Sequence, residues 1–131
     1  MIDPNLLAKK RIMLVEDDPF SAQLSQLMLR QIGARSITVT NDGKEALQIL
    51  TVAAANFDLV ISDLNMPQIG GLELLEQVRR IRPDLPFLLI TGTASKETVV
   101  AAQGQGVNGY IVKPFSADQL GKKIAAVFAG R

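Results

Sequence analysis

Residues 58–67, DLVISDLNMP, place a short apolar run directly before a carboxylate and a proline. Such a run, bounded by polar residues on both sides, is typical of a strand that is buried on both faces. Similar runs occur at residues 12–15, 87–90 and 110–112. A weaker run at 37–40 alternates between apolar and polar residues, as an edge strand does. The sequence therefore predicts five strands.

The segments between these runs have the apolar spacing of helices. The first carries its apolar side chains at helical intervals, at Phe20, Leu24, Leu27, Met28 and Ile32. It follows Asp18 and Pro19, which are typical of an N-cap and a first helical residue. Similar spacing predicts helices over residues 43–50, 71–81, 95–103 and 116–128. The helix over 95–103 runs into Gly104–Gln105–Gly106, where helix propensity is poor, so we expect it to be mobile.

Strands that alternate with helices at this spacing predict an α/β fold, with a parallel sheet covered by helices on both faces. Residues 1–8 are expected to be a short N-terminal tail, and residues 9–131 a single domain. The chain has a net charge of +1 and lacks cysteine and histidine. This composition argues against thiol or histidine catalysis, common zinc sites and direct nucleic-acid or membrane binding. A cytoplasmic protein is therefore expected.

Functional side chains of an open parallel sheet gather where the strands end. The residues that follow the predicted strands are Glu16, Asp17, Asp18, Asp63, Thr91 and Lys113. Carboxylates this close repel one another unless a cation lies between them, and oxygen ligands without histidine or cysteine are typical of Mg²⁺. Asp18 is expected to cap a helix. Capping alone does not explain Asp63, which ends another buried strand and needs a partner there.

These residue types match the needs of phosphoryl transfer to a carboxylate. An aspartate is the nucleophile, a metal ion and an ammonium neutralise the developing charge, and a hydroxyl hydrogen-bonds the phosphoryl group. A cis bond between Lys113 and Pro114 would turn the lysine toward the other groups. An aspartyl-phosphate phosphatase is a weaker alternative, because Asn65 stands where that class carries a second acid. A flavin-binding domain is another, but no phosphate-cradling loop of the P-loop type is visible.

Five segments at these separations resemble the receiver domains of two-component response regulators, and more closely the single-domain chemotaxis-regulator (CheY-like) type. The segments are residues 14–18 (LVEDD), 58–67, 70–71 (GG), 90–92 (ITG) and 109–115 (GYIVKPF). The resemblance implies a doubly wound, flavodoxin-like sheet of strand order 2-1-3-4-5 with five helices.

The resemblance also implies a role for the charged residues. Asp63 resembles the phosphoacceptor, and Glu16 and Asp17 resemble the acidic pair that holds Mg²⁺. The backbone carbonyl of Asn65 would be a further metal ligand. Lys113 resembles the lysine that binds the phosphoryl group.

Thr91 resembles the switch hydroxyl of the family, and Tyr110 resembles the aromatic residue whose rotamer is coupled to it. Asn65 and Thr93 occupy positions at which the family tunes hydrolysis of its aspartyl phosphate. Gly92 stands where the family more often has alanine, which widens access to the phosphate.

The resemblance implies that a histidine kinase or a histidine phosphotransfer protein supplies the phosphoryl group. A downstream protein would bind through the fourth helix, the fifth strand and the fifth helix. We expect a signalling phosphoacceptor rather than an enzyme with a separate substrate, acting as a monomer or a phosphorylation-dependent dimer. Two alternatives stay open: a degenerate receiver that binds proteins without phosphorylation, and a receiver cut from a longer regulator.

Overall fold

The computed structural model describes residues 3, 5–92 and 95–130. Within these residues five strands form one sheet: β1 (Arg11–Val15), β2 (Ser36–Thr40), β3 (Leu59–Asp63), β4 (Phe87–Thr91) and β5 (Gly109–Val112). Their order across the sheet is β2-β1-β3-β4-β5, and every neighbouring pair is parallel. The α/β fold that the sequence predicts and the strand order that the family resemblance implies are therefore confirmed.

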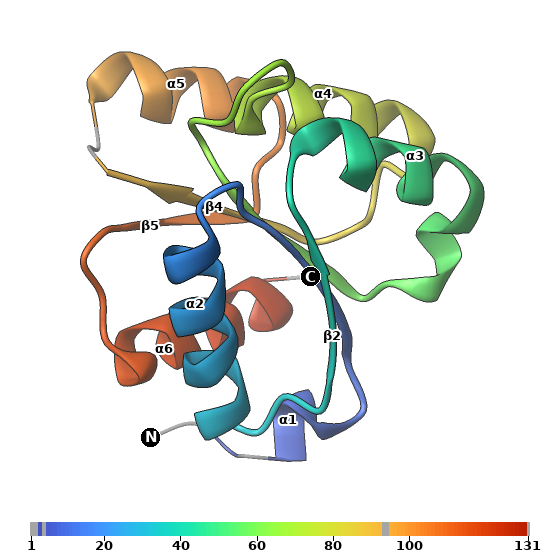
Figure 1. The fold of residues 1–131 in the computed structure, drawn as a ribbon. Coiled ribbons are helices and arrows are strands. Elements are labelled where there is room, and N and C mark those ends of the chain that lie inside the picture. Colours follow the sequence, from blue (N-terminus) through green and yellow to red (C-terminus); the bar gives the residue numbers. More distant parts are fainter. Residues whose placement is uncertain (1–2, 4, 93–94, 131) are drawn as a thin grey trace.

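Helices cover both faces of the sheet (Figure 1). The described residues form α1 (Asn5–Ala8), α2 (Pro19–Gln31), α3 (Gly43–Ala53), α4 (Gly71–Ile81), α5 (Lys96–Gly104) and α6 (Ala117–Ala129), with a 3₁₀ turn at Ala54–Asn56. Helices α2 and α6 lie on one face, and α3, α4 and α5 lie on the other. Within the described ranges, none of these helices combines the length and apolarity that a membrane crossing requires.

Two apolar clusters hold these layers together. Side chains alternate between the two faces of a strand, so Leu14 and Ile61 pack toward α2 and α6, whereas Met13 and Val60 pack toward α3 and α4. All four are at most 1% exposed. Burying each such side chain contributes about 1.5–3 kcal/mol. The central strands are thus rigid supports for whatever their carboxyl ends carry.

The N-terminal segment differs from the prediction. Residues 5–8 form helix α1, which makes a sixth helix where the sequence predicts five. Leu7 is fully buried in the cluster beneath α2 and α6, and Lys10 Nζ lies 4.9 Å from the centre of the Phe128 ring. The prediction of a short tail over 1–8 is therefore wrong for residues 5–8, because Leu7 packs in the apolar cluster that also holds residues of α2 and α6.

Helix α2 begins as predicted, but only part of its predicted apolar face packs on the core. Asp18 caps it by accepting a hydrogen bond from the Ser21 amide at 3.1 Å, and Gly33, with φ of 110°, follows its end. The helix buries Ala22, Ser25 and Leu29. Phe20, Leu24 and Leu27, which the spacing assigns to a packed face, are instead 66%, 45% and 55% exposed. Met28 and Ile32 of the predicted face do pack against the core, so Phe20, Leu24 and Leu27 form the exposed row of α2.

Candidate functional site

Four neighbouring strands deliver polar side chains to the same edge of the sheet. β1 ends just before Glu16 and Asp17, β3 ends at Asp63, β4 ends at Thr91, and β5 ends just before Lys113. Because β1, β3, β4 and β5 are parallel and adjacent, their carboxyl ends meet. The sequence and the structure therefore agree on where the chemistry-bearing residues lie.

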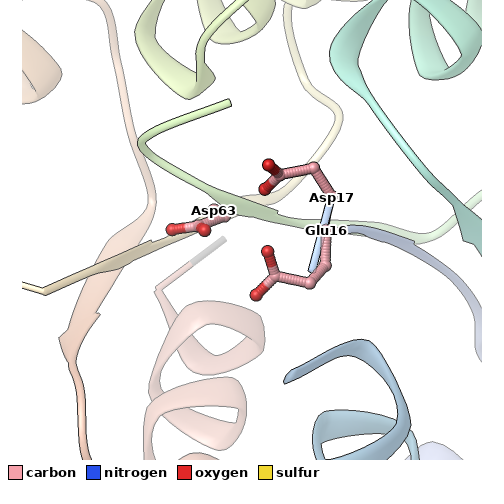
Figure 2. A group of neighbouring side chains, drawn as sticks. All are labelled: Glu16, Asp17 and Asp63. Carbon is pink, nitrogen blue, oxygen red and sulfur yellow. The ribbon is translucent and has the colours of Figure 1, made fainter. Parts of the chain in front are cut away.

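Three carboxylates form an acidic cluster at this edge. Glu16, Asp17 and Asp63 each offer an oxygen, and these oxygens all lie within 4.8 Å of one another. Glu16 and Asp17 project from one stretch of chain toward the side on which Asp63 lies (Figure 2). Glu16 and Asp63 are buried, whereas Asp17 is exposed. A set of oxygen donors with one solvent-facing side fits Mg²⁺, which usually retains several waters.

The electrostatics of Glu16 are those of a crowded acidic site. Its side chain is 2% exposed. Burial, followed by the neighbouring Asp63, raises the pKa of Glu16 from 4.5 to about 7. A cation placed among the three carboxylates would relieve this repulsion, which is a physical reason for the cluster to bind a metal ion.

Lys113 bridges two members of the acidic cluster. Its Nζ lies 3.2 Å from Glu16 Oε1 and 3.5 Å from Asp63 Oδ2. Burial alone would lower the pKa of Lys113, but the charges of Asp63 and Glu16 outweigh burial, so this pKa lies above its ordinary value. The Lys113–Pro114 peptide bond is cis, the isomer expected at this corner. An ammonium thus lies against the carboxylate that the family resemblance identifies as the expected phosphoacceptor.

Thr91 and Tyr110 lie on the adjacent strands β4 and β5. Thr91, at the end of β4, is 1% exposed. It pairs in register with Val112, two residues beyond Tyr110 on β5. Tyr110 is half-buried, and Lys123 Nζ lies 5.6 Å from the centre of its ring. The hydroxyl and the aromatic ring are therefore carried by neighbouring strands, with Tyr110 two residues before the partner of Thr91.

The remaining predicted positions surround the cluster. Asn65 is exposed in the loop after Asp63. Gly92 is exposed, and a Cβ built on it would meet no atom of the described structure within 4 Å, which agrees with an open approach to the site. Thr93 lies outside the described residues.

Gly71 packs closely on the backbone at the site. The sequence shows it only as part of a two-glycine motif and does not predict this contact. It is the first residue of α4, and its amide donates to the Leu64 carbonyl at 2.8 Å. A Cβ on Gly71 would lie 2.5 Å from the Asp63 carbonyl oxygen, 2.9 Å from Leu64 Cα and 2.8 Å from Leu89 Cδ1. The start of α4 therefore packs directly on the backbone that carries the acceptor, and no side chain fits between them.

A Gly71→Ala variant is expected to lose about 2 kcal/mol of unfolding free energy, because the added methyl group overlaps backbone atoms that cannot yield easily. Urea denaturation measures the loss. Gly104→Ala is the matched control, since a Cβ at Gly104 in α5 meets nothing within 4 Å of the described atoms. The control should be neutral or slightly stabilising. Equal stability of the two variants would contradict the packing argument.

Two grooves lie near the site. The larger, of about 520 Å³, runs between β5 and α6. It is lined by Tyr110, Ile111, Val112, Pro114, Phe115, Gln119, Lys122, Lys123 and Ala126. The smaller, of about 160 Å³, separates α2 from the segment after β5. Its lining includes Leu24, Met28 and Lys113, so one residue of the exposed row on α2 shares a groove with the lysine of the site.

Comparison with known proteins points to one family. The family model described as the response regulator receiver domain matches residues 12–125. The chain is 36% identical over 121 residues to the chemotaxis protein CheY of Pseudomonas aeruginosa, which covers 90% of this chain and 95% of that protein. It is 37% identical over 120 residues to the chemotaxis protein CheY-3 of Vibrio cholerae, at 90% and 91% coverage.

Solved structures share the fold. Chemotaxis protein CheY4 of Vibrio cholerae superposes with a TM-score of 0.81 at 31% identity, covering 90% of this chain and 98% of that one. The receiver domain of the histidine kinase CKI1 from Arabidopsis thaliana, solved in complex with Mg²⁺ and BeF₃⁻, has a TM-score of 0.87. At 22% identity, with 97% and 95% coverage, this second likeness concerns the fold alone.

Proposed function

Because the chain belongs to the response regulator receiver domain family and is CheY-like, we propose that it is a phosphorylation switch whose acceptor is Asp63. The donor is the phosphohistidine of a histidine kinase or a histidine phosphotransfer protein, which provides the histidine that this chain lacks. The observation that carries the proposal is the placement of Lys113 Nζ against the buried Asp63 carboxylate, within a cluster of three acids. The protein acts in the cytoplasm, as a monomer or as a phosphorylation-dependent dimer.

The transfer step is an in-line displacement at phosphorus. An Oδ atom of Asp63 forms the new P–O bond, the P–N bond to the donor imidazole breaks, and the electron pair returns to that imidazole. Lys113 neutralises negative charge on the transferred group. Mg²⁺, held by Glu16, Asp17, Asp63 and the backbone carbonyl of Asn65, would supply further neutralisation. Water later hydrolyses the acyl phosphate at a rate tuned by Asn65 and Thr93.

The phosphoryl group is sensed by the neighbouring strands. A hydrogen bond between the Thr91 hydroxyl and the phosphoryl group favours an inward Tyr110 and a displaced α5, which is a shift between two states of one fold. Tyr110 lines the larger groove together with Lys122 and Lys123. This face is formed by α5, β5 and α6; α5 and α6 are the fourth and fifth helices of the sequence prediction, because α1 adds one to the numbering. A downstream protein that offers acidic and apolar groups matches it.

The exposed row on α2 is suited to the phosphoryl donor. Phe20, Leu24 and Leu27 are spaced by four and three residues, so they form a single stripe on the helix. Leu24 and Lys113 line the same groove, and Lys113 pairs with Asp63, so a protein seated on the stripe would lie close to the acceptor. An apolar helix next to the phosphohistidine would pack on this stripe as helices generally pack on one another.

Replacing Phe20 and Leu27 with alanine is expected to slow phosphorylation by a protein donor about tenfold or more, since buried aromatic contacts dominate such interfaces. The probe is a purified phosphohistidine phosphotransfer domain that phosphorylates the wild-type chain. Phosphorylation by acetyl phosphate should not change, because this small donor needs no docking surface. Val52→Ala is the control, since Val52 is 85% exposed on α3. Equal slowing with both donors would contradict a docking role for the row.

Intact mass after incubation with acetyl phosphate and Mg²⁺ tests the function itself. The wild-type chain is expected to gain ~80 Da, the mass of one phosphoryl group, and the gain should vanish with EDTA or in Asp63→Asn. A stable analogue, BeF₃⁻ with Mg²⁺, guards against loss of a short-lived acyl phosphate. If neither reagent alters the protein, the degenerate binding module is the better description.

A further inference from the structure

Arg79, in the last turn of α4, hydrogen-bonds with the loop before β4 and with the segment between α5 and β5. Its Nε and Nη2 donate to the Gly106 carbonyl at 3.1 and 2.8 Å. Its Nη2 also donates to Asn108 Oδ1 at 2.7 Å, and its Nη1 donates to the Leu85 carbonyl at 2.6 Å. We call this set of contacts the Arg79 clasp. It joins α4 to the segment between α5 and β5.

Asn108 extends the Arg79 clasp into the sheet. Its Oδ1 accepts a second hydrogen bond from the Phe87 amide at 2.8 Å, and its own amide donates to the Phe87 carbonyl at 3.1 Å. The start of β5 is therefore fixed both to the start of β4 and to α4. Hydrogen bonds that involve a guanidinium are stronger than those between neutral groups.

The end of α5 next to the clasp is an ordered helix terminus. Gly106 has φ of 78°, and its amide donates to the Gln103 carbonyl, while the Val107 amide donates to the Ala102 carbonyl, each at 3.1 Å. This pair of bonds is the Schellman arrangement, for which glycine is favoured. Gly104 and Gly106, from which the sequence predicts a mobile helix, thus lie in a hydrogen-bonded turn that Arg79 contacts.

The rest of α5 is attached more weakly. Among the residues of α5, all of which the structure describes, only Ala102 is buried, and it lies near the clasped end. Val100 is 57% exposed. The other end begins after Ser95, whose side chain caps the helix through the Thr98 amide at 3.2 Å. That end is the one nearer in the chain to Thr91, the proposed switch hydroxyl.

We propose that the Arg79 clasp makes the C-terminal end of α5 a fixed pivot, so that activation moves the end near Thr91 while residues 104–108 stay in place. This inference rests on the proposed function, because the movement answers phosphorylation of Asp63. Arg79 is then a positioning residue that acts far from the acidic cluster. It determines which part of the output face changes, namely the first turns of α5 rather than the loop before β5.

Peptide-resolved hydrogen exchange tests the pivot. The protein is compared with Mg²⁺ alone and with Mg²⁺ and BeF₃⁻. In the wild-type chain, exchange over 96–100 should change severalfold on adding BeF₃⁻, whereas exchange over 104–108 should change less than about twofold. In Arg79→Met, residues 104–108 should exchange about tenfold faster and should also respond to BeF₃⁻.

Three further variants sharpen the comparison. Arg80→Met is the matched control, since Arg80 is exposed on the same helix and pairs with Glu76 at 3.0 Å. Asn108→Asp keeps the acceptor and adds a charge opposite Arg79, so exchange over 104–108 should slow. Asn108→Ala removes only the side-chain link, so exchange over 104–108 should become faster to a smaller extent. This variant replaces Arg79→Met in the test if Arg79→Met does not fold.

Two results would overturn the pivot: an equal response of 96–100 and 104–108 to BeF₃⁻ in the wild-type chain, or identical exchange in Arg79→Met and Arg80→Met. Absence of any response to BeF₃⁻, including over residues 58–67, would overturn the proposed function and the movement with it. Even then, exchange over 104–108 in Arg79→Met and Arg80→Met without BeF₃⁻ would show whether Arg79 fixes these residues.

Discussion

A Lys113→Met variant is expected to accept phosphoryl groups about 100-fold more slowly than the wild-type chain while binding Mg²⁺ at least as tightly. Removing one group that stabilises the developing charge typically costs this much in rate. Lys113 Nζ lies 3.2 Å from Glu16 and 3.5 Å from Asp63, where it competes with a metal ion for the same carboxylates. Its loss should therefore leave the acidic cluster more negative and more attractive to Mg²⁺.

The two effects are measured separately. Intact mass against time with acetyl phosphate gives the rate of phosphorylation, and calorimetry without a phosphoryl donor gives the Mg²⁺ affinity. Lys122→Met is the control, because Lys122 is 65% exposed and pairs with Asp118 on α6. A parallel loss of Mg²⁺ binding and rate in Lys113→Met would show that the lysine only supports the metal site. An unchanged rate would remove Lys113 from the transfer step.

Local patterns in the sequence determine most of the site. The strands that carry Asp63 and Thr91 are short apolar runs, and a parallel sheet brings the carboxyl ends of such runs to one edge. The acidic cluster and the position of Lys113 follow from that rule without any knowledge of side-chain packing. The roles given to Tyr110 and Asn65 depend instead on the family resemblance, because nothing in the spacing distinguishes them from ordinary strand and loop residues.

Contacts between segments distant in the sequence were not predictable in the same way. Leu7 lies in an unpatterned segment, and only the complete fold provides its apolar site. The spacing of Phe20, Leu24 and Leu27 correctly indicates a helix, but it cannot distinguish which of two apolar faces packs on the sheet. The bonds of Arg79 to the segment after α5 join residues 27 and 29 positions apart, and no local pattern signals them.

The metal-free protein is expected to lose stability as the pH rises from 5 to 8. Glu16 has a folded-state pKa of about 7, above its ordinary value of 4.5. Between these two values the native state keeps a proton that the unfolded chain has already released, so the contribution of Glu16 to stability is complete below pH 4.5 and is lost as the pH rises through 7. At about 1.4 kcal/mol for each pH unit between the two pKa values, the loss reaches about 3 kcal/mol.

Urea denaturation at several pH values, with EDTA or with saturating Mg²⁺, checks this prediction. Mg²⁺ should remove most of the slope, because it binds the ionised form of Glu16 and stabilises the folded state. In Glu16→Gln the free energy of unfolding should also depend little on pH, since the amide does not titrate. This variant should gain less stability from Mg²⁺. The absence of histidine leaves few other groups to titrate in this range. An equal slope in Glu16→Gln and wild type would mean that another group is responsible, and the acidic cluster would then be less strained by repulsion than its burial indicates.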